Sequence, residues 1–288
     1  MPLLYNYPEK IISLDQGIKI NYCDEGSGEC CLLFVHGLAN YFPVWNSNIE
    51  FFKKFYRTIA LDLPGNGKSS INGNSQYNIS FYTDCVRQFI EKLSLKNVVL
   101  IGHSMGAQIV TNLAIRNTIQ IKKLILCSPS GIERFEEWEK VLLKNALFLG
   151  NQWNADETYI STIIQKSFFQ SLLEAAKIIS DLTKLMQTRN RSSYQKMIHE
   201  SILAMLNEPI YLKLKQIECP CLLLIGAKDQ MIPNSWLHPM LTPDKIGSWA
   251  SVEIKDCEYH LIQDCGHFIQ IEQSLRFNQI LQHFIRDL

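Results

Sequence analysis

Ser104 occupies the centre of Gly102-His103-Ser104-Met105-Gly106, which separates an apolar run from a segment with helical periodicity. A serine between two glycines, at the point where a buried strand turns into a helix, is the pattern of a sharp turn that exposes the hydroxyl group. The amino end of the following helix stabilises negative charge that develops beside it. The sequence therefore predicts that Ser104 is a nucleophile.

A serine hydroxyl reacts readily only when a positioned base accepts its proton and a third group orients that base. For this strand-turn-helix pattern the expected chain order is serine, acid, histidine, with the histidine after the last strand. Asp229 follows the apolar run in LLLIGAKD, and His267 follows the last one in LIQDCGHF. The segment CSPSG, after the preceding strand, has no carboxylate. Asp229 is therefore the predicted acid and His267 the predicted base.

Other acids and histidines fit structural roles better. Asp264 lies three residues before His267, where we expect it to shape the turn. His103 lies inside the glycine-serine motif, and we expect packing or hydrogen bonding from it because the base comes from elsewhere. Surface or core positions are expected for the histidines that lack a Gly-His turn: His199, His238, His260 and His283.

Attack by an activated serine on a carbonyl group creates an oxyanion, which needs hydrogen-bond donors. The backbone N–H of the residue after the nucleophile supplies one donor, and a loop after an earlier strand supplies the other. Met105 and Leu38 occupy these positions, and Gly37 allows the chain to turn before Leu38. We expect His36 to tie this loop down by hydrogen bonds.

The composition points to a globular protein that acts on a small molecule. The chain has 288 residues, 47% of them hydrophobic, and 28 basic residues balance 28 acidic ones. This balance argues against binding to nucleic acid or to an anionic membrane surface. No run approaches the length of a membrane span. The nine cysteines show no metal-site spacing, and the amino terminus lacks a secretory pattern, so we expect structural thiols and a cytoplasmic location. The composition fixes no oligomeric state.

Strand and helix patterns alternate along most of the chain. A hairpin is expected over residues 10–26, and continuous apolar runs predict buried strands. A helix is expected after Asn78 or Ser80, either of which could cap it, another after Ser104, and a third at the carboxyl end. The expected strands lie within residues 30–37, 56–62, 97–102, 121–129, 219–229 and 259–266. This order predicts an α/β fold with an open, mainly parallel sheet and helices on both faces.

Residues 131–216 break the alternation, because they show helical patterns without a strand signal. Helices are expected over Glu136–Leu149, Thr158–Phe169, Leu172–Met186 and Ser193–Leu206. This stretch is too long for a simple connection in a compact α/β domain. We therefore expect a helical cap over residues 131–216, inserted into a core formed by residues 1–130 and 217–288.

These motifs together resemble the α/β-hydrolase fold serine hydrolases. The resemblance rests on HGLANYFPVW, DLPGNGKS, GHSMG, GAKDQMIP and CGHF, in that order along nearly the whole chain. It implies an eight-stranded, mostly parallel sheet with an antiparallel hairpin at one edge and a cap between strands six and seven. It also implies that the reaction needs no metal or organic cofactor. The serine at the turn points away from the epoxide hydrolases of this fold, and GHSMG is similar to esterases, carbon-carbon bond hydrolases and monoacylglycerol lipase-like enzymes.

The expected activity is hydrolysis of a small, mostly apolar ester through an acyl-enzyme intermediate. Phe42, Trp45 and Met231 lie beside the motifs and are expected to line the pocket. Two alternatives remain at this stage: cleavage of a carbon-carbon bond, and a ligand-binding signalling role with slow turnover. Arg189 and Arg191 could bind a substrate carboxylate, although solvated surface charge is the expectation for both.

Overall fold

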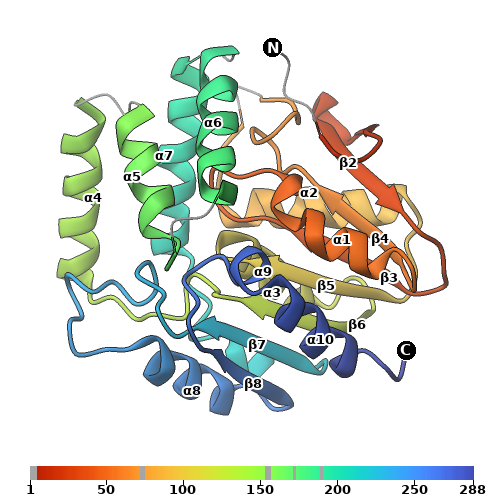
Figure 1. The fold of residues 1–288 in the computed structure, drawn as a ribbon. Helices are drawn as coiled ribbons and strands as arrows, with labels where there is room; N and C mark the ends of the chain where they lie inside the picture. The colour runs from red at the N-terminus through yellow and green to blue at the C-terminus, as the bar shows by residue number, and fades with distance from the viewer. Residues whose placement is uncertain (1–4, 72–74, 153–156, 171–172, 189–190) are drawn as a thin grey trace.

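An eight-stranded sheet organises the chain in the computed structural model, which describes residues 5–71, 75–152, 157–170, 173–188 and 191–288 (Figure 1). The strand order is β1-β2-β4-β3-β5-β6-β7-β8. Antiparallel pairing joins β1 to β2 and β2 to β4, and the other neighbours are parallel. The strands are β1 (Lys10–Ser13), β2 (Lys19–Glu25), β3 (Cys31–Val35), β4 (Arg57–Leu61), β5 (Val98–His103), β6 (Ile121–Cys127), β7 (Cys221–Gly226) and β8 (Cys257–Ile262). The predicted eight-stranded, mostly parallel sheet and its hairpin edge are confirmed.

The central strands are buried on both faces because helices cover the sheet on either side. Every residue of β3, β5 and β7 is buried, as their continuous apolar sequences predict. Alternate residues face opposite layers: Leu33 and Leu100 lie in one core, whereas Leu32 and Val99 lie in the other. Both layers therefore hold the sheet rigid beneath the loops at its carboxyl edge.

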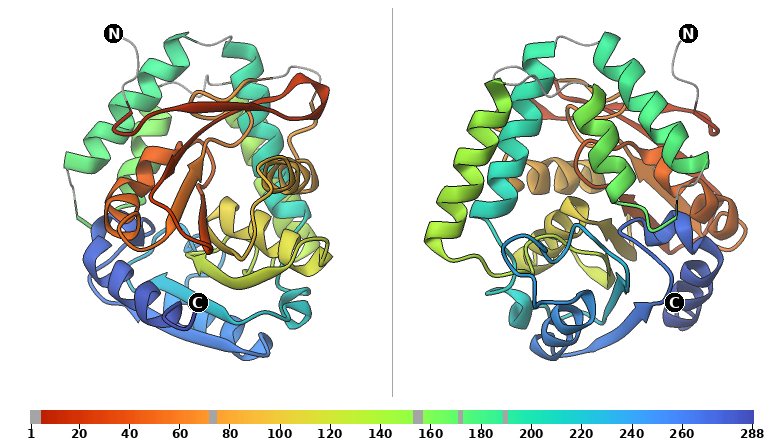
Figure 2. Two further views of the ribbon diagram at one scale, coloured as in Figure 1. Left: turned by 90° about the vertical axis from the view of Figure 1, so that its right-hand side faces the viewer. Right: turned by 60° about the vertical axis from the view of Figure 1, so that its left-hand side comes forward.

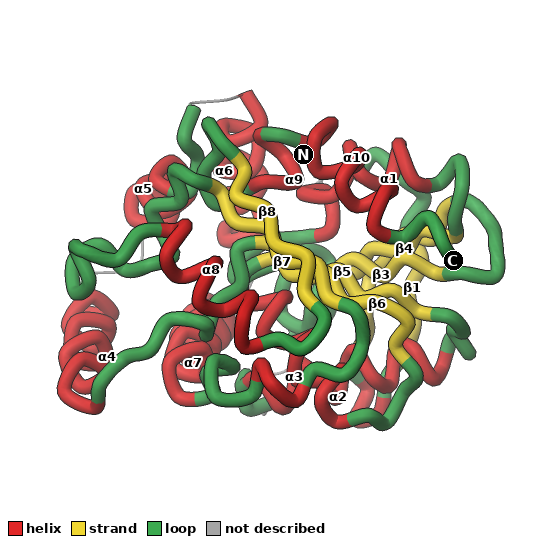
Figure 3. Tube along the Cα trace, turned by 90° about the horizontal axis from the view of Figure 1, so that it is seen from below, coloured by secondary structure: helices red, strands yellow, loops and turns green. Residues whose placement is uncertain are grey.

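Helices from distant parts of the chain form these two layers. Figure 3 shows α2 and α3 on one side of the sheet and α1 and α10 on the other. The first layer contains α2 (Ile79–Lys92), α3 (Met105–Arg116) and α8 (Pro243–Glu253), and the second contains α1 (Asn46–Phe52), α9 (Ile269–Glu272) and α10 (Ser274–Phe284). Short 3-10 helices are η1 (Asp15–Gly17), η2 (Phe42–Trp45) and η3 (Leu214–Gln216).

Local signals explain where several helices begin. Asn78 caps α2, since its side-chain oxygen accepts a hydrogen bond from the N–H of Phe81 at 2.7 Å. The sequence reading gave no helix for α1 or α8. Thr242 caps α8 by accepting a hydrogen bond from the N–H of Lys245, and Pro243 opens its first turn. The Thr-Pro pair was thus a start signal that could have revealed α8.

Four consecutive α-helices lie between β6 and β7 in the part of the chain that the structure describes, as predicted. They are α4 (Glu137–Gln152), α5 (Glu157–Lys166), α6 (Leu173–Thr188) and α7 (Arg191–Asn207), and we call them the cap. Figure 1 shows the cap grouped at the end of the sheet toward which the arrows of β6 and β7 point, and Figure 2 shows the same grouping from two further sides. The first and last cap helices, α4 and α7, pack against each other. The cap therefore faces the loops that carry the predicted site residues.

Candidate active site

Ser104 lies at the sharp turn between β5 and α3. Its backbone has φ 54° and ψ −119°, a conformation that residues other than glycine rarely adopt. Its carbonyl oxygen accepts hydrogen bonds from Ala107 and Ser130, and its N–H donates to Cys127 at 3.0 Å. Several contacts hold this strained turn in place, as expected where strain serves function.

Three glycines allow other backbone segments to approach this turn. A Cβ on Gly106 would lie 2.4 Å from the carbonyl oxygen of Val35, and one on Gly102 would lie 2.5 Å from Cα of Ala107. A Cβ on Gly37 would lie 3.0 Å from Cβ of Ser104. Helix α3 and the loop after β3 can therefore pack closely beside Ser104 only because these positions lack side chains.

Asp229 and His267 form a direct hydrogen bond although they are 38 positions apart in the chain. Nδ1 of His267 lies 2.8 Å from Oδ2 of Asp229, and both residues are buried. The other oxygen, Oδ1 of Asp229, accepts from the N–H groups of Met231 at 2.8 Å and Ile232 at 3.1 Å. A carboxylate held in this way places the imidazole proton on Nδ1 and leaves Nε2 able to accept a proton.

His103 connects the turn to the loop that carries His267. Its Nε2 donates to the carbonyl oxygen of His267 at 2.9 Å, and the two imidazole rings lie 4.7 Å apart. Burial, together with the charge of a protonated His267, lowers the pKa of His103 well below its usual value. Neutral His103 thus holds the backbone of His267, which agrees with the expected hydrogen-bonding role.

His36 fixes the loop that follows β3. Its Nε2 accepts a hydrogen bond from the N–H of Leu63 at 2.9 Å, and its Nδ1 donates to the carbonyl oxygen of Gly37 at 2.7 Å. Burial lowers the pKa of His36 to about 4, so the neutral ring fills this role. The expectation that His36 ties the loop down is confirmed. Leu38 follows directly and lines the cavity, and Met105 is the first residue of α3.

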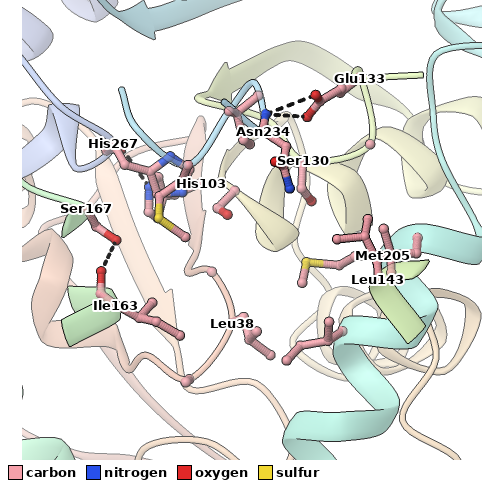
Figure 4. Close-up of a pocket in the computed structure, with 18 of the residues that line it drawn as sticks. Leu38, His103, Ser130, Glu133, Leu143, Ile163, Ser167, Met205, Asn234 and His267 are labelled. Atoms are coloured by element: carbon pink, nitrogen blue, oxygen red, sulfur yellow. Dashed lines mark hydrogen bonds between the residues drawn. The ribbon is translucent and has the colours of Figure 1, made fainter. Parts of the chain in front are cut away.

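A cavity of about 360 Å³ lies between the cap and the sheet, and both Ser104 and His267 line it. In Figure 4, His103 and His267 lie side by side on one part of its wall, and Leu143 and Met205 lie together on another. The cap contributes a largely aliphatic wall: Leu143 from α4, Ile163 and Ile164 from α5, and Ile198, Ile202, Met205 and Leu206 from α7. The volume of the cavity is typical of sites that bind small molecules.

Two of the three residues expected in the pocket lie elsewhere. Met231 lines the cavity, but Phe42 and Trp45 do not. Both aromatic rings are fully buried in the core beneath η2, where Trp45 packs against Phe34 and Phe42 packs against Tyr5. Their expected place in the pocket is corrected, because η2 turns these apolar side chains toward the sheet. Of the two arginines considered, Arg189 lies outside the described residues, and the structure does not describe the side chain of Arg191.

The sequence reading missed a polar cluster of His238, Glu133 and Glu139 beside the cavity. His238 Nδ1 lies 2.5 Å from Oε1 of Glu133, and its Nε2 lies 3.0 Å from Oε1 of Glu139. Glu133 lines the cavity and also accepts from the N–H of Asn234. Burial alone would lower the pKa of His238, but the two carboxylates outweigh it and raise the pKa. Burial raises the pKa of Glu133 despite its hydrogen bonds.

The sequence held one signal for this cluster. Glu133 follows CSPSG by two residues, so a slightly longer window after β6 would have included it. Nothing local marked His238 as its partner, because the two are 105 positions apart. The cluster joins the start of the cap to the loop that also carries Asp229.

The described residues contain no group of three or more His, Cys, Asp or Glu side chains arranged to hold a metal ion. Within the same part of the chain, no helix combines the length and apolar character required to cross a bilayer.

Comparisons with known proteins agree with this architecture. A family model described as alpha/beta hydrolase fold matches residues 31–274. Epoxide hydrolase 2 of Caenorhabditis elegans is 26% identical, over 99% of this chain and 81% of its own. (E)-2-((N-methylformamido)methylene)succinate hydrolase of Acinetobacter baylyi is 31% identical, over 96% and 97%. Among solved structures, a probable hydrolytic enzyme from Pseudomonas aeruginosa superposes with a TM-score of 0.84 at 23% identity, covering 98% of this chain and 95% of that one.

Proposed function

The chain belongs to the α/β-hydrolase fold family, and from this premise we propose that it is a serine hydrolase that cleaves a small, mostly apolar carboxylic ester. The carrying observation is that His267, which is hydrogen-bonded to Asp229, lines the same cavity as Ser104. A serine at the turn, rather than an aspartate, distinguishes this chemistry from epoxide opening by an enzyme carboxylate.

The proposed reaction has two steps. His267 Nε2 accepts the proton of Ser104 as Oγ attacks the ester carbonyl, and Asp229 stabilises the imidazolium that forms. The N–H groups of Leu38 and Met105 bind the oxyanion. His267 then protonates the departing alcohol, leaving an acyl group on Ser104. In the second step His267 activates water, which releases the acid and restores the serine.

The cavity wall supports a neutral substrate with an aliphatic group. Among the described lining residues, Lys140 is the one permanently charged cation, and its ammonium group lies 2.7 Å from Glu137. Glu133 adds a carboxylate to the same wall. A substrate carboxylate would therefore meet a paired lysine and a like charge, whereas an alkyl chain would meet the aliphatic side chains of the cap. For this reason we favour ester hydrolysis over cleavage of a carboxylated substrate such as the succinate for which the Acinetobacter relative is named.

The test combines covalent labelling with turnover. The wild-type protein should hydrolyse p-nitrophenyl butyrate through many turnovers and should be labelled by a fluorophosphonate. Ser104→Ala should fold normally, as circular dichroism can show, and should lose both properties. Ser130→Ala is the matched control, because Ser130 also lines the cavity but donates its hydroxyl to Gln108 at 2.7 Å.

Three results would count against the proposal. Persistent labelling of Ser104→Ala at another residue would refute the assignment of Ser104 as the nucleophile. A single slow turnover by the wild-type protein would favour the signalling alternative. Faster cleavage of a vinylogous diketone acid than of neutral esters would favour carbon-carbon bond hydrolysis.

A further inference from the structure

The loop that carries His267 is fastened to the cap as well as to the core. The N–H of His267 donates to the carbonyl oxygen of Ser167 at 2.8 Å. Ser167 is the first residue after α5, and its side chain lines the same cavity as His267. Figure 4 shows both residues on the same part of the cavity wall. A direct hydrogen bond therefore joins the backbone of the proposed base to a segment of the cap.

Glu272, in α9, joins these two segments a second time. Its Oε1 accepts from the N–H of Gly266 at 2.9 Å, directly before His267. Its Oε2 accepts from the N–H of Phe169 at 2.9 Å and from that of Gln170 at 3.4 Å. One carboxylate thus bridges the cap segment 167–170 and the His267 loop, and we call this arrangement the clasp.

The clasp requires both side-chain oxygens of residue 272 to accept hydrogen bonds. All its donors are backbone N–H groups, and hydrogen bonds to an ionised carboxylate are stronger than those to a neutral group. Burial raises the pKa of Glu272, although the bonds from Phe169, Gln170 and Gly266 oppose this effect. A glutamine of the same shape would turn its NH₂ group toward an N–H on one side, so it could hold only one of the two segments.

Packing around the clasp leaves little room for another arrangement. A Cβ on Gly266 would lie 2.7 Å from the nitrogen of Phe169 and 2.8 Å from the carbonyl oxygen of Ser167. The buried rings of Phe168 and Phe268 stack with centroids 4.7 Å apart and an interplanar angle of 11°. The residues on both sides of His267 are therefore in close contact with the cap.

We propose that Glu272 is a positioning residue, which couples the seating of cap segment 167–170 to the placement of the His267 imidazole for proton transfer. The inference rests on the proposed hydrolase function. Glu272 touches neither Ser104 nor the cavity, so it acts through His267. Displacement of a catalytic group by about 1 Å can cost about 100-fold in rate, which is why a remote carboxylate can govern turnover.

The test compares Glu272→Gln with Glu253→Gln, which makes the same chemical change at an exposed residue of α8. For Glu272→Gln we expect kcat on p-nitrophenyl butyrate to fall by about 10- to 100-fold while KM changes by less than about 3-fold. The rate of fluorophosphonate labelling should fall by a similar factor, because it also requires His267 as the base. Glu253→Gln should match the wild-type protein. A kcat for Glu272→Gln equal to that of the wild-type protein would overturn the inference.

Hydrogen exchange on the folded wild-type protein provides a second test that does not depend on a variant. The amides of residues 167–170 and 264–268 should exchange at a common rate, and a phosphonate bound to Ser104 should slow both segments together. Independent exchange of the two segments would contradict the coupling. If the wild-type protein neither hydrolyses esters nor reacts with the phosphonate, the proposed hydrolase function is wrong. This outcome is distinct from an active wild-type protein in which Glu272→Gln has no effect, which would contradict the positioning role alone.

Discussion

Nδ1 of His267 lies 2.8 Å from Oδ2 of Asp229, and two backbone N–H groups fix the second oxygen of that carboxylate. This relationship determines which imidazole nitrogen carries the proton. We therefore expect Asp229→Asn to fold but to lose about 10³- to 10⁴-fold in kcat, because an amide in this position favours the wrong tautomer. The measurement is steady-state hydrolysis of a p-nitrophenyl ester. Asp264→Asn, in the turn before His267, should retain activity, and the opposite result would reassign the acid.

Gly106 should resist replacement although it lies in a helix. In an exposed helix, Gly→Ala stabilises by up to about 1 kcal/mol. At Gly106 the added Cβ would lie 2.4 Å from the carbonyl oxygen of Val35 and 2.5 Å from that of His36. We expect Gly106→Ala to lower the free energy of unfolding by about 1–3 kcal/mol, measured in urea, and to lower kcat as the turn shifts. Gly17→Ala, where a Cβ meets nothing within 4 Å, should leave kcat unchanged.

Met205 should limit the length of the acyl chain. It projects from α7 into the aliphatic wall of the cavity, and Figure 4 shows it beside Leu143. Met205→Trp should reduce kcat/KM for octanoate and laurate esters by about 10-fold or more, while acetate changes by less than about 3-fold. Leu212→Trp, at an exposed position, is the control. An unchanged chain-length profile for Met205→Trp would show that the acyl group lies elsewhere.

His36 should make the protein less stable in acid. Its folded pKa is lowered to about 4 by burial, whereas in the unfolded chain it stays near the usual value. As the pH falls, His36 is therefore protonated in the unfolded state before it is protonated in the folded state. The stabilisation from neutral His36 is fully present above about pH 6.5 and is lost as the pH falls toward 4. The loss is on the order of 3 kcal/mol at 1.36 kcal/mol per pKa unit. His36→Gln should flatten the dependence of unfolding free energy on pH in this window, and an unchanged slope would contradict this origin.

His238 should have the opposite pH dependence. Its pKa is raised by Glu133 and Glu139, which face its two ring nitrogens, while the ring of Phe135 stacks on it. The protonated form binds both carboxylates, so its stabilisation is full below about pH 6.5 and is lost as the pH rises through the higher folded pKa. We expect His238→Gln to lower Tm below that pH, corresponding to about 1 kcal/mol, and to differ less from the wild-type protein at high pH. His283→Gln, at an exposed position of α10, is the control variant.

Local sequence patterns predicted most of the architecture because strands and helices bury side chains with regular periods. The continuous apolar runs of β3, β5 and β7 and the helical periodicity of α4 to α7 depend on neighbours only a few residues apart. The missed elements were short or polar, as α1 and α8 are. The motif order also predicted Ser104, Asp229 and His267 as site residues, because each follows a strand whose carboxyl end must lie at the same edge of the sheet.

The tertiary structure alone decided which side chains meet across loops. Phe42 and Trp45 looked available to a pocket from their positions beside the motifs, but η2 buries them in the opposite direction. The contacts of Glu133 with His238 and of Glu272 with Phe169 span more than 100 positions each. No local period encodes such contacts, because they arise only when the cap is packed onto the edge of the sheet. The sequence by itself therefore determined the chemistry that could occur, and the packing decided which residues hold that chemistry in place.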